Sequence, residues 1–174
     1  MALVFTVGNP GDVFMEPYGT AVQKVLEARF GRSMELDSSD DPWYTEELGW
    51  SGWAALQERA LEFLAPDKIE HLLSMEAWKG AYLPVETVPM SLDFIPGDTT
   101  PLKVASLRRL IEELTLIGRA LKLPTDIQGL ESLAQSYLED DDLIDEDVEI
   151  QTYAQLFLAA YKAVSRNQPL WVVK

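Results

Sequence analysis

Apolar side chains recur along this chain with helical spacing, most clearly near its middle. Between Pro101 and Lys122 they return every three or four positions, so they share one face of a helix. The apolar positions are Val104, Leu107, Leu110, Ile111, Leu114, Ile117 and Leu121. We expect this helix to form the centre of the core. Its solvent face would carry ion pairs formed by Arg108, Arg109, Glu112 and Glu113.

Five other segments have similar periodicity, which predicts about six helices in all. Their ranges are 17–30, 51–64, 66–79, 125–138 and 145–166. Short apolar runs at Ala2–Val7 and Leu170–Val173 predict strands that share a sheet. Residues 33–36 predict another short strand, and residues 82–94 an irregular or edge strand. The pattern therefore predicts a mainly helical α+β fold with a small sheet, in a single globular domain over residues 1–174.

Composition narrows the class of protein. Apolar residues make up 47% of the chain, which is typical of a globular protein and too many for a disordered one. The chain has no cysteine, so disulfides, thiolate zinc sites and cysteine nucleophiles are excluded. No signal peptide and no apolar run long enough to span a bilayer is present, which predicts a cytoplasmic protein.

The negative charge is concentrated in two places. Residues 35–47 contain six acidic side chains, residues 123–150 contain ten, and neither segment contains a lysine or arginine. Together they carry −16 against a net charge of −15, so the rest of the chain sums to +1. A nucleic-acid binder needs a basic surface, and an anionic membrane attracts one, so we expect neither nucleic acid nor membrane as a partner.

The densest acidic run, residues 139–149, does not have the pattern of a metal site. An EF-hand loop needs glycine at its sixth position and glutamate at its twelfth. Counting from Asp140 places Asp145 at the sixth position and Gln151 at the twelfth. A two-metal carboxylate site would need histidine nearby, and the single histidine, His71, lies far away in sequence. No metal or cofactor is predicted.

We predict a non-enzymatic binding protein of the inhibitor or immunity type, which engages a basic protein partner. Clustered carboxylates attract a cationic protein at long range, and small acidic inhibitors of nucleases or toxins have a similar charge and size. The aromatic residues beside the first acidic segment are typical of interfaces. One contact surface would contain Asp140, Asp141, Asp142, Asp145, Glu146 and Asp147. The other would contain Asp40, Asp41, Trp43, Tyr44, Glu46 and Glu47.

Three alternatives stay open. The acidic segments could simply be solvated, with Trp43 and Tyr44 folded back onto the core beside Trp50 and Trp53. A small-ligand-binding protein or hydrolase could use a carboxylate-lined pocket, for example Glu112 or Glu113 near Asp93 or His71. A structural domain that forms homo-oligomers is the third. The sequence itself favours an ion-paired or half-buried His71 over a catalytic one.

Overall fold

A mixed β-sheet forms the middle layer of the protein. A computed structural model describes residues 2–31, 41–76, 80–94, 101–138 and 148–173. The strand order is β2-β1-β7-β4-β6-β5, and β3 also pairs with β1. The strands are β1 (Ala2–Val7), β2 (Trp43–Tyr44), β3 (Leu48–Gly49), β4 (Gly80–Leu83), β5 (Met90–Phe94), β6 (Pro101–Ser106) and β7 (Leu170–Val173). Among these described strands, only β4 and β6 pair in parallel, and the other pairs are antiparallel.

Side chains alternate between the two faces of this sheet, so each face has its own core. On β7, Leu170 and Val172 lie in the larger core, whereas Trp171 between them lies in the smaller one. On β4, Tyr82 points to the larger core, and Ala81 points to the smaller core. A sheet that is buried on both faces requires helices on both sides.

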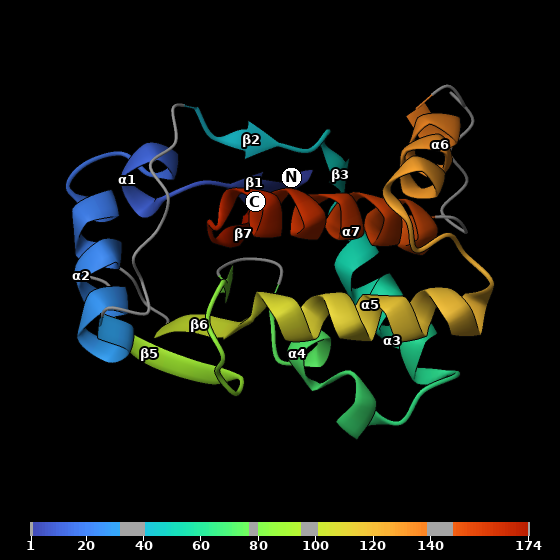
Figure 1. The fold of residues 1–174 in the computed structure, drawn as a ribbon, viewed down its shortest axis with the longest axis horizontal. Helices are drawn as coiled ribbons and strands as arrows, with labels where there is room; N and C mark the ends of the chain where they lie inside the picture. Colours follow the sequence, from blue (N-terminus) through green and yellow to red (C-terminus); the bar gives the residue numbers. More distant parts are fainter. Residues whose placement is uncertain (1, 32–40, 77–79, 95–100, 139–147, 174) are drawn as a thin grey trace.

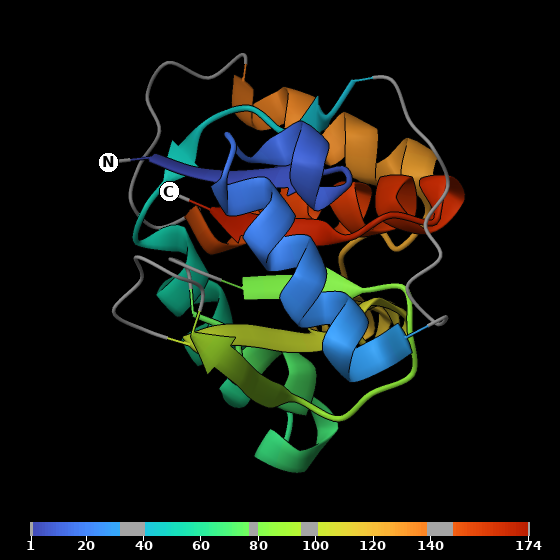
Figure 2. The same cartoon turned by 90° about the vertical axis from the view of Figure 1, so that its left-hand side faces the viewer.

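The helices supply these two covering layers. The larger core lies under α3 (Gly52–Leu61), α5 (Leu107–Leu121) and α7 (Val148–Arg166), with α6 (Ile127–Leu138) packed on α7. The smaller core lies under α2 (Tyr18–Phe30), which crosses the strands on the opposite side (Figure 2). Three short helical segments, α1 (Pro10–Val13), η2 (Pro66–Lys68) and α4 (Glu70–Leu73), lie in connections. None of the helices within the described ranges is long and apolar enough to cross a membrane.

The predicted α+β class is confirmed, and so is the pairing of the terminal strands β1 and β7 (Figure 1). The sheet is larger than predicted, because it also contains β6 and the short strands β2 and β3. The predicted strand at residues 33–36 lies outside the described residues. The prediction that residues 1–174 form a single domain stays a prediction.

The predicted helix over residues 101–122 is partly wrong. Pro101–Ser106 forms strand β6, and the helix begins only at Leu107. Leu102 and Val104 are buried two positions apart, as in a strand, because β6 pairs in parallel with β4. Ser106 then caps α5: its hydroxyl oxygen accepts a hydrogen bond from the Arg109 N–H at 3.4 Å.

Two other predicted segments also differ in the structure. Residues 66–79 were expected to form one helix, but the described part forms η2 and α4, with a break at Ile69. The backbone of Ile69 has φ −134°, which is not helical. No strand was predicted within residues 41–49, yet they contain β2 and β3.

Candidate functional site

One border of the sheet is formed by residues Asp41–Trp50, which we call the acidic edge. It is held against β1 by backbone pairing at both ends, with Tyr44 opposite Thr6 and Leu48 opposite Leu3. Between these pairs, the Thr45 N–H donates to the Phe5 carbonyl oxygen, and the Thr45 hydroxyl accepts from the Phe5 N–H, both at 3.0 Å. Both backbone groups of Phe5 are therefore satisfied by one residue of the acidic edge.

The acidic edge contains one residue more than β1 does over the same interval. Three residues, Thr45, Glu46 and Glu47, span the distance that two residues span on β1 between Leu3 and Thr6. This is the geometry of a β-bulge, which breaks the regular alternation of side chains. Thr45 and Leu48 on either side are buried, whereas the two glutamates are both exposed. The bulge thus turns two adjacent carboxylates outward.

The acidic edge runs alongside α7 (Figure 1). At the C-terminal end of α7, Arg166 Nη1 donates a hydrogen bond to the Asp41 carbonyl oxygen at 2.9 Å. At the N-terminal end, a Cβ placed on Gly49 would lie 3.3 Å from Val148 Cγ2. The two ends of the acidic edge therefore lie near the two ends of α7.

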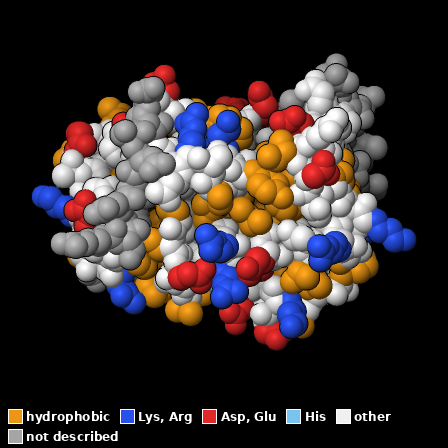
Figure 3. Space-filling view, in the orientation of Figure 1, with side chains coloured by type: hydrophobic (Ala, Val, Ile, Leu, Met, Phe, Trp, Pro, Cys, Tyr) orange, Lys and Arg blue, Asp and Glu red, His pale blue; other side chains and the backbone are white. Residues whose placement is uncertain are grey.

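The carboxylates of the acidic edge lie apart from the ion pairs of the described chain, and Arg166 binds the backbone of Asp41 and not its carboxylate. Among the residues that the structure describes, no ion pair includes Asp41, Glu46 or Glu47. The ion pairs lie elsewhere, and they are Arg59–Glu62, Lys103–Glu76, Arg109–Glu86 and Arg109–Glu112. Figure 3 shows the two signs of charge mixed over the lower part of the molecule, where α4 and α5 lie.

The structure brings together the predicted site residues that it describes. Asp41, Tyr44, Glu46 and Glu47 are exposed on the acidic edge, and Trp43 is partly buried against the larger core. The remaining predicted residues, Asp40, Asp140, Asp141, Asp142, Asp145, Glu146 and Asp147, lie outside the described residues.

The expectation that the aromatic residues fold back onto the core holds only in part. Trp53 is buried, but Tyr44 and Trp50 have exposed fractions of 55% and 54%. Trp50 was not among the predicted site residues, because its closeness to Trp53 in sequence suggested that both were core residues. Its place directly after the acidic segment was the signal that could have identified it.

A second candidate lies on the opposite side of α5, where His71 and Glu113 form a buried polar cluster with Tyr82 and Ser106. Glu113 accepts hydrogen bonds from the backbone N–H groups of His71 and Leu72, at 3.0 and 2.8 Å. His71 Nδ1 accepts from the Ser106 N–H at 3.1 Å, and the Tyr82 hydroxyl donates to the His71 carbonyl at 2.8 Å. The cluster joins α4 and α5 to strands β4 and β6.

Burial sets the protonation of this cluster. It raises the pKa of Glu113 to about 7, although the two backbone hydrogen bonds act in the opposite direction. Burial also lowers the pKa of His71 below its ordinary value, partly offset by the negative charge of Glu70. Glu113 was predicted to lie on the solvent face of its helix. That prediction is wrong: the side chain is 6% exposed, since α4 packs over it.

The buried polar cluster borders a cleft of about 710 Å³ between α4, α5 and the connection from β4 to β5. The cleft is lined by Glu70, Glu86, Glu112 and Glu113 together with His71 and Arg109, so it resembles the predicted carboxylate-lined pocket. Three of these four glutamates are already engaged, however. Glu86 and Glu112 pair with Arg109 at 3.6 and 3.1 Å, and both oxygens of Glu113 bind backbone N–H groups. The arrangement holds the fold together and does not favour acid–base catalysis.

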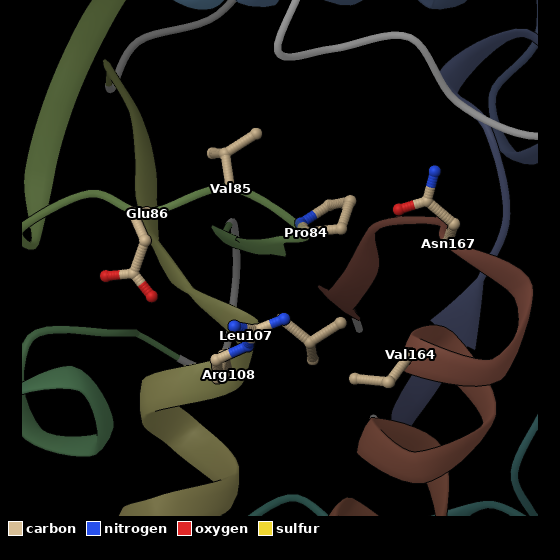
Figure 4. A pocket seen from close by; sticks show the side chains of 7 residues that line it. All are labelled: Pro84, Val85, Glu86, Leu107, Arg108, Val164 and Asn167. Carbon is tan, nitrogen blue, oxygen red and sulfur yellow. The ribbon is translucent and has the colours of Figure 1, made fainter.

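A smaller pocket of about 250 Å³ lies where β4 ends, between α5 and the end of α7 (Figure 4). Its walls are largely apolar, and Leu107 and Val164 approach each other across it. Among the described residues that line it, Glu86 is the only one with a carboxylate, and this side chain pairs with Arg109. No group of acidic or histidine side chains within the described ranges could hold a metal ion.

Comparison with known proteins gives one finding. A family model described as "Putative DNA-mimic protein" matches residues 21–172, a range that contains the whole acidic edge. No curated protein and no solved structure matches the chain.

Proposed function

The chain belongs to this family of DNA-mimic proteins, and we propose that it occupies the surface of a DNA-binding protein where DNA would otherwise bind. The family match is the observation that carries the proposal. DNA offers a DNA-binding protein closely spaced negative charges on a stiff scaffold, about one per 1.7 Å of duplex. A mimic must hold carboxylates outward in a comparable way.

The function and partner expected from the sequence are corrected by the family match. The predicted inhibitor of the immunity type, with a partner specified only as a basic protein, is replaced by a protein defined through the DNA that it imitates. The alternatives of a hydrolase, a small-ligand-binding protein or a structural oligomer are not favoured either. The sequence could not separate these classes, because a net charge of −15 suits several of them equally.

Three properties of the acidic edge support it as the contact surface. Its carboxylates have no ion-pair partner among the residues described, so they need not break an existing pair to bind. Its backbone is fixed by β1 and by Arg166, so little conformational entropy is lost on binding. Its bulge leaves Glu46 and Glu47 both exposed next to each other, and their combined field attracts a cationic groove.

The acidic run that precedes α7 is part of the same proposal. Gly49 contacts Val148, the first described residue after this run, so the run joins the molecule beside the acidic edge. We include its carboxylates in the proposed surface, namely Asp140, Asp141, Asp142, Asp145, Glu146 and Asp147. A target among DNA-binding proteins also implies that the protein acts in the cytoplasm.

A displacement experiment tests this function. Extract of the native host is loaded on a resin that carries both native and heat-denatured DNA, and the purified protein is then added at constant ionic strength. We expect it to release DNA-binding proteins, which are identified by mass spectrometry and tested again after purification. Glu46→Gln combined with Glu47→Gln should require roughly three- to tenfold more protein for the same release.

The matched control is Glu27→Gln combined with Glu58→Gln. These glutamates are also exposed and outside the described ion pairs, and their replacement changes the net charge by the same amount. The control should release the same proteins as the parent at the same concentration. Release of no DNA-binding protein, or equal behaviour of the two double variants, would overturn the proposal.

A further inference from the structure

The acidic edge presents more than charge. Its outward side chains follow one another in the order Asp41, Tyr44, Glu46, Glu47 and Trp50, so carboxylates and aromatic rings are interleaved. Tyr44 and Trp50 expose about half of their surface, at 55% and 54%. Exposed ring faces are not a feature of duplex DNA, because a duplex buries the faces of its bases in the stack.

Single-stranded DNA presents the same two features as this row of side chains, namely exposed flat rings and negative charges. Its bases are unstacked, and proteins that bind it combine a positively charged groove with aromatic side chains on which the bases stack. An exposed tyrosine or tryptophan ring offers such a groove a flat π-face, as a base does. A carboxylate offers the negative charge of a phosphate. The interleaved row therefore fits a groove built for a single strand.

The backbone of the acidic edge has the matching shape. Strands rise about 3.3 Å per residue, so the two rings, six positions apart in sequence, are separated by at most ~20 Å. Glu46 and Glu47 lie between them at the bulge. Residues Trp43, Thr45 and Leu48 point inward and fix this spacing. Tyr44 thus lies on β2, the two glutamates lie at the bulge between β2 and β3, and Trp50 lies in the turn that follows β3.

We propose that the acidic edge imitates a single DNA strand, and that its partner is a protein that binds single-stranded DNA in a basic groove lined with aromatic residues. The inference rests on the proposed function and narrows its partner class. Tyr44 and Trp50 take the places of bases, and Asp41, Glu46 and Glu47 take the places of phosphates.

Two resins separate the partner classes. One carries oligo(dT) and the other a hairpin duplex; both are loaded with extract of the native host and challenged with the purified protein. We expect release from oligo(dT) at concentrations that leave the duplex resin unaffected. The released proteins are identified, purified and tested by fluorescence anisotropy, with labelled oligo(dT) as the displaced probe.

The aromatic residues are tested without changing the charge. Tyr44→Ser combined with Trp50→Ser should raise the concentration needed for displacement by roughly a hundredfold, because each stacked ring contributes about tenfold or more. Phe63→Ser is the control. Phe63 is 51% exposed just after the C-terminal end of α3, away from the acidic edge, and the Arg59 guanidinium lies 5.1 Å from its ring centroid. It should leave displacement unchanged. Circular dichroism and the melting temperature verify that all variants are folded.

The outcomes are distinguishable. Release from the duplex resin alone, or an aromatic double variant as effective as the parent, would overturn the single-strand inference and leave the proposed function standing. Release from neither resin would overturn the proposed function itself.

Discussion

Carboxylates serve different purposes in the buried polar cluster and on the acidic edge. In the cluster, both oxygens of Glu113 bind backbone N–H groups of α4, and the side chain is almost fully buried. On the acidic edge, Glu46 and Glu47 are exposed and belong to no ion pair within the described chain. The acidic side chains of this protein therefore have two different roles. Glu113 stabilises the contact between α4 and α5, whereas the exposed glutamates are available to a partner.

The polar groups beneath these two regions also differ. Thr45, the buried polar residue of the acidic edge, has a neutral side chain and forms hydrogen bonds with both backbone groups of Phe5. Glu113 in the cluster is ionisable, with a pKa raised to about 7. Stability should therefore depend on pH through the cluster and not through the backbone of the acidic edge. The predictions below test this separation, beginning with the largest effect.

The stability of the cluster should decrease as the pH rises. The folded protein keeps the Glu113 proton up to about pH 7, whereas the unfolded chain releases it near 4.5, the ordinary value. The folded state therefore binds the extra proton within this window, and its contribution of roughly 3 kcal/mol is lost as the pH rises from 4.5 to 7. Urea denaturation at several pH values measures it.

Glu113→Gln is the control, because it removes this titration. His71 acts in the opposite sense: its pKa is lowered, so its contribution to stability is lost as the pH falls below 6.5. Since His71 is present in both proteins, the difference between parent and variant isolates Glu113. A difference that does not change between pH 4.5 and 7 would contradict the role assigned to the carboxyl.

The anchoring of the acidic edge should be weaker in Thr45→Val. Valine has nearly the same shape but no hydroxyl, so the buried Phe5 N–H loses its acceptor, at a cost of about 1–2 kcal/mol. We expect lower stability by urea denaturation and faster amide exchange at Phe5. The loss should be the same at pH 5 and pH 8; a loss that follows pH would link the two regions.

The charges of the acidic edge should act on encounter with the partner. Glu46→Gln combined with Glu47→Gln should slow association about three- to tenfold and change dissociation less, because long-range attraction mainly affects the association rate. Surface plasmon resonance with the displaced DNA-binding protein measures both rates. Charge reversal at Asp141 and Asp145 should act in the same way. An effect confined to dissociation would show that these side chains act through direct contacts instead.

The smallest effect is expected on the charge-balanced face. Glu112→Gln breaks an exposed ion pair with Arg109, which contributes little to stability because solvent screens both charges. It should change neither the melting temperature measurably nor the displacement of DNA. A clear loss of displacement would extend the contact surface to α5.

The sequence correctly predicted those helices and strands whose own apolar spacing matches the structure that they adopt in the fold. The terminal strands and α2, α3, α6 and α7 have such signals in their apolar spacing and turn residues. β6 does not: Val104 and Leu107 have helical spacing, and only pairing with β4, some twenty positions away in sequence, makes Pro101–Ser106 a strand. Parallel pairing between segments distant in sequence leaves little trace in local spacing.

The sequence predicted several residues of the candidate site but not the backbone geometry that exposes them. The acids and aromatic residues of the acidic edge are evident in the sequence, yet the bulge that turns Glu46 and Glu47 outward depends on the register with β1. Glu113 could have been found, because it lies three positions after Leu110 and four before Ile117, on the buried face of its helix. The N–H groups of α4 that donate hydrogen bonds to Glu113 could not have been predicted from the sequence.

Amide hydrogen exchange of the protein, alone and bound to the DNA-binding protein that it displaces from DNA, tests the central claim most directly. The claim is that this partner sits on the acidic edge in place of DNA. It predicts slower exchange on binding at residues 41–50 and in the first turn of α7, with unchanged exchange in α4 and α5. Protection over α4 and α5, with none along residues 41–50, would contradict it.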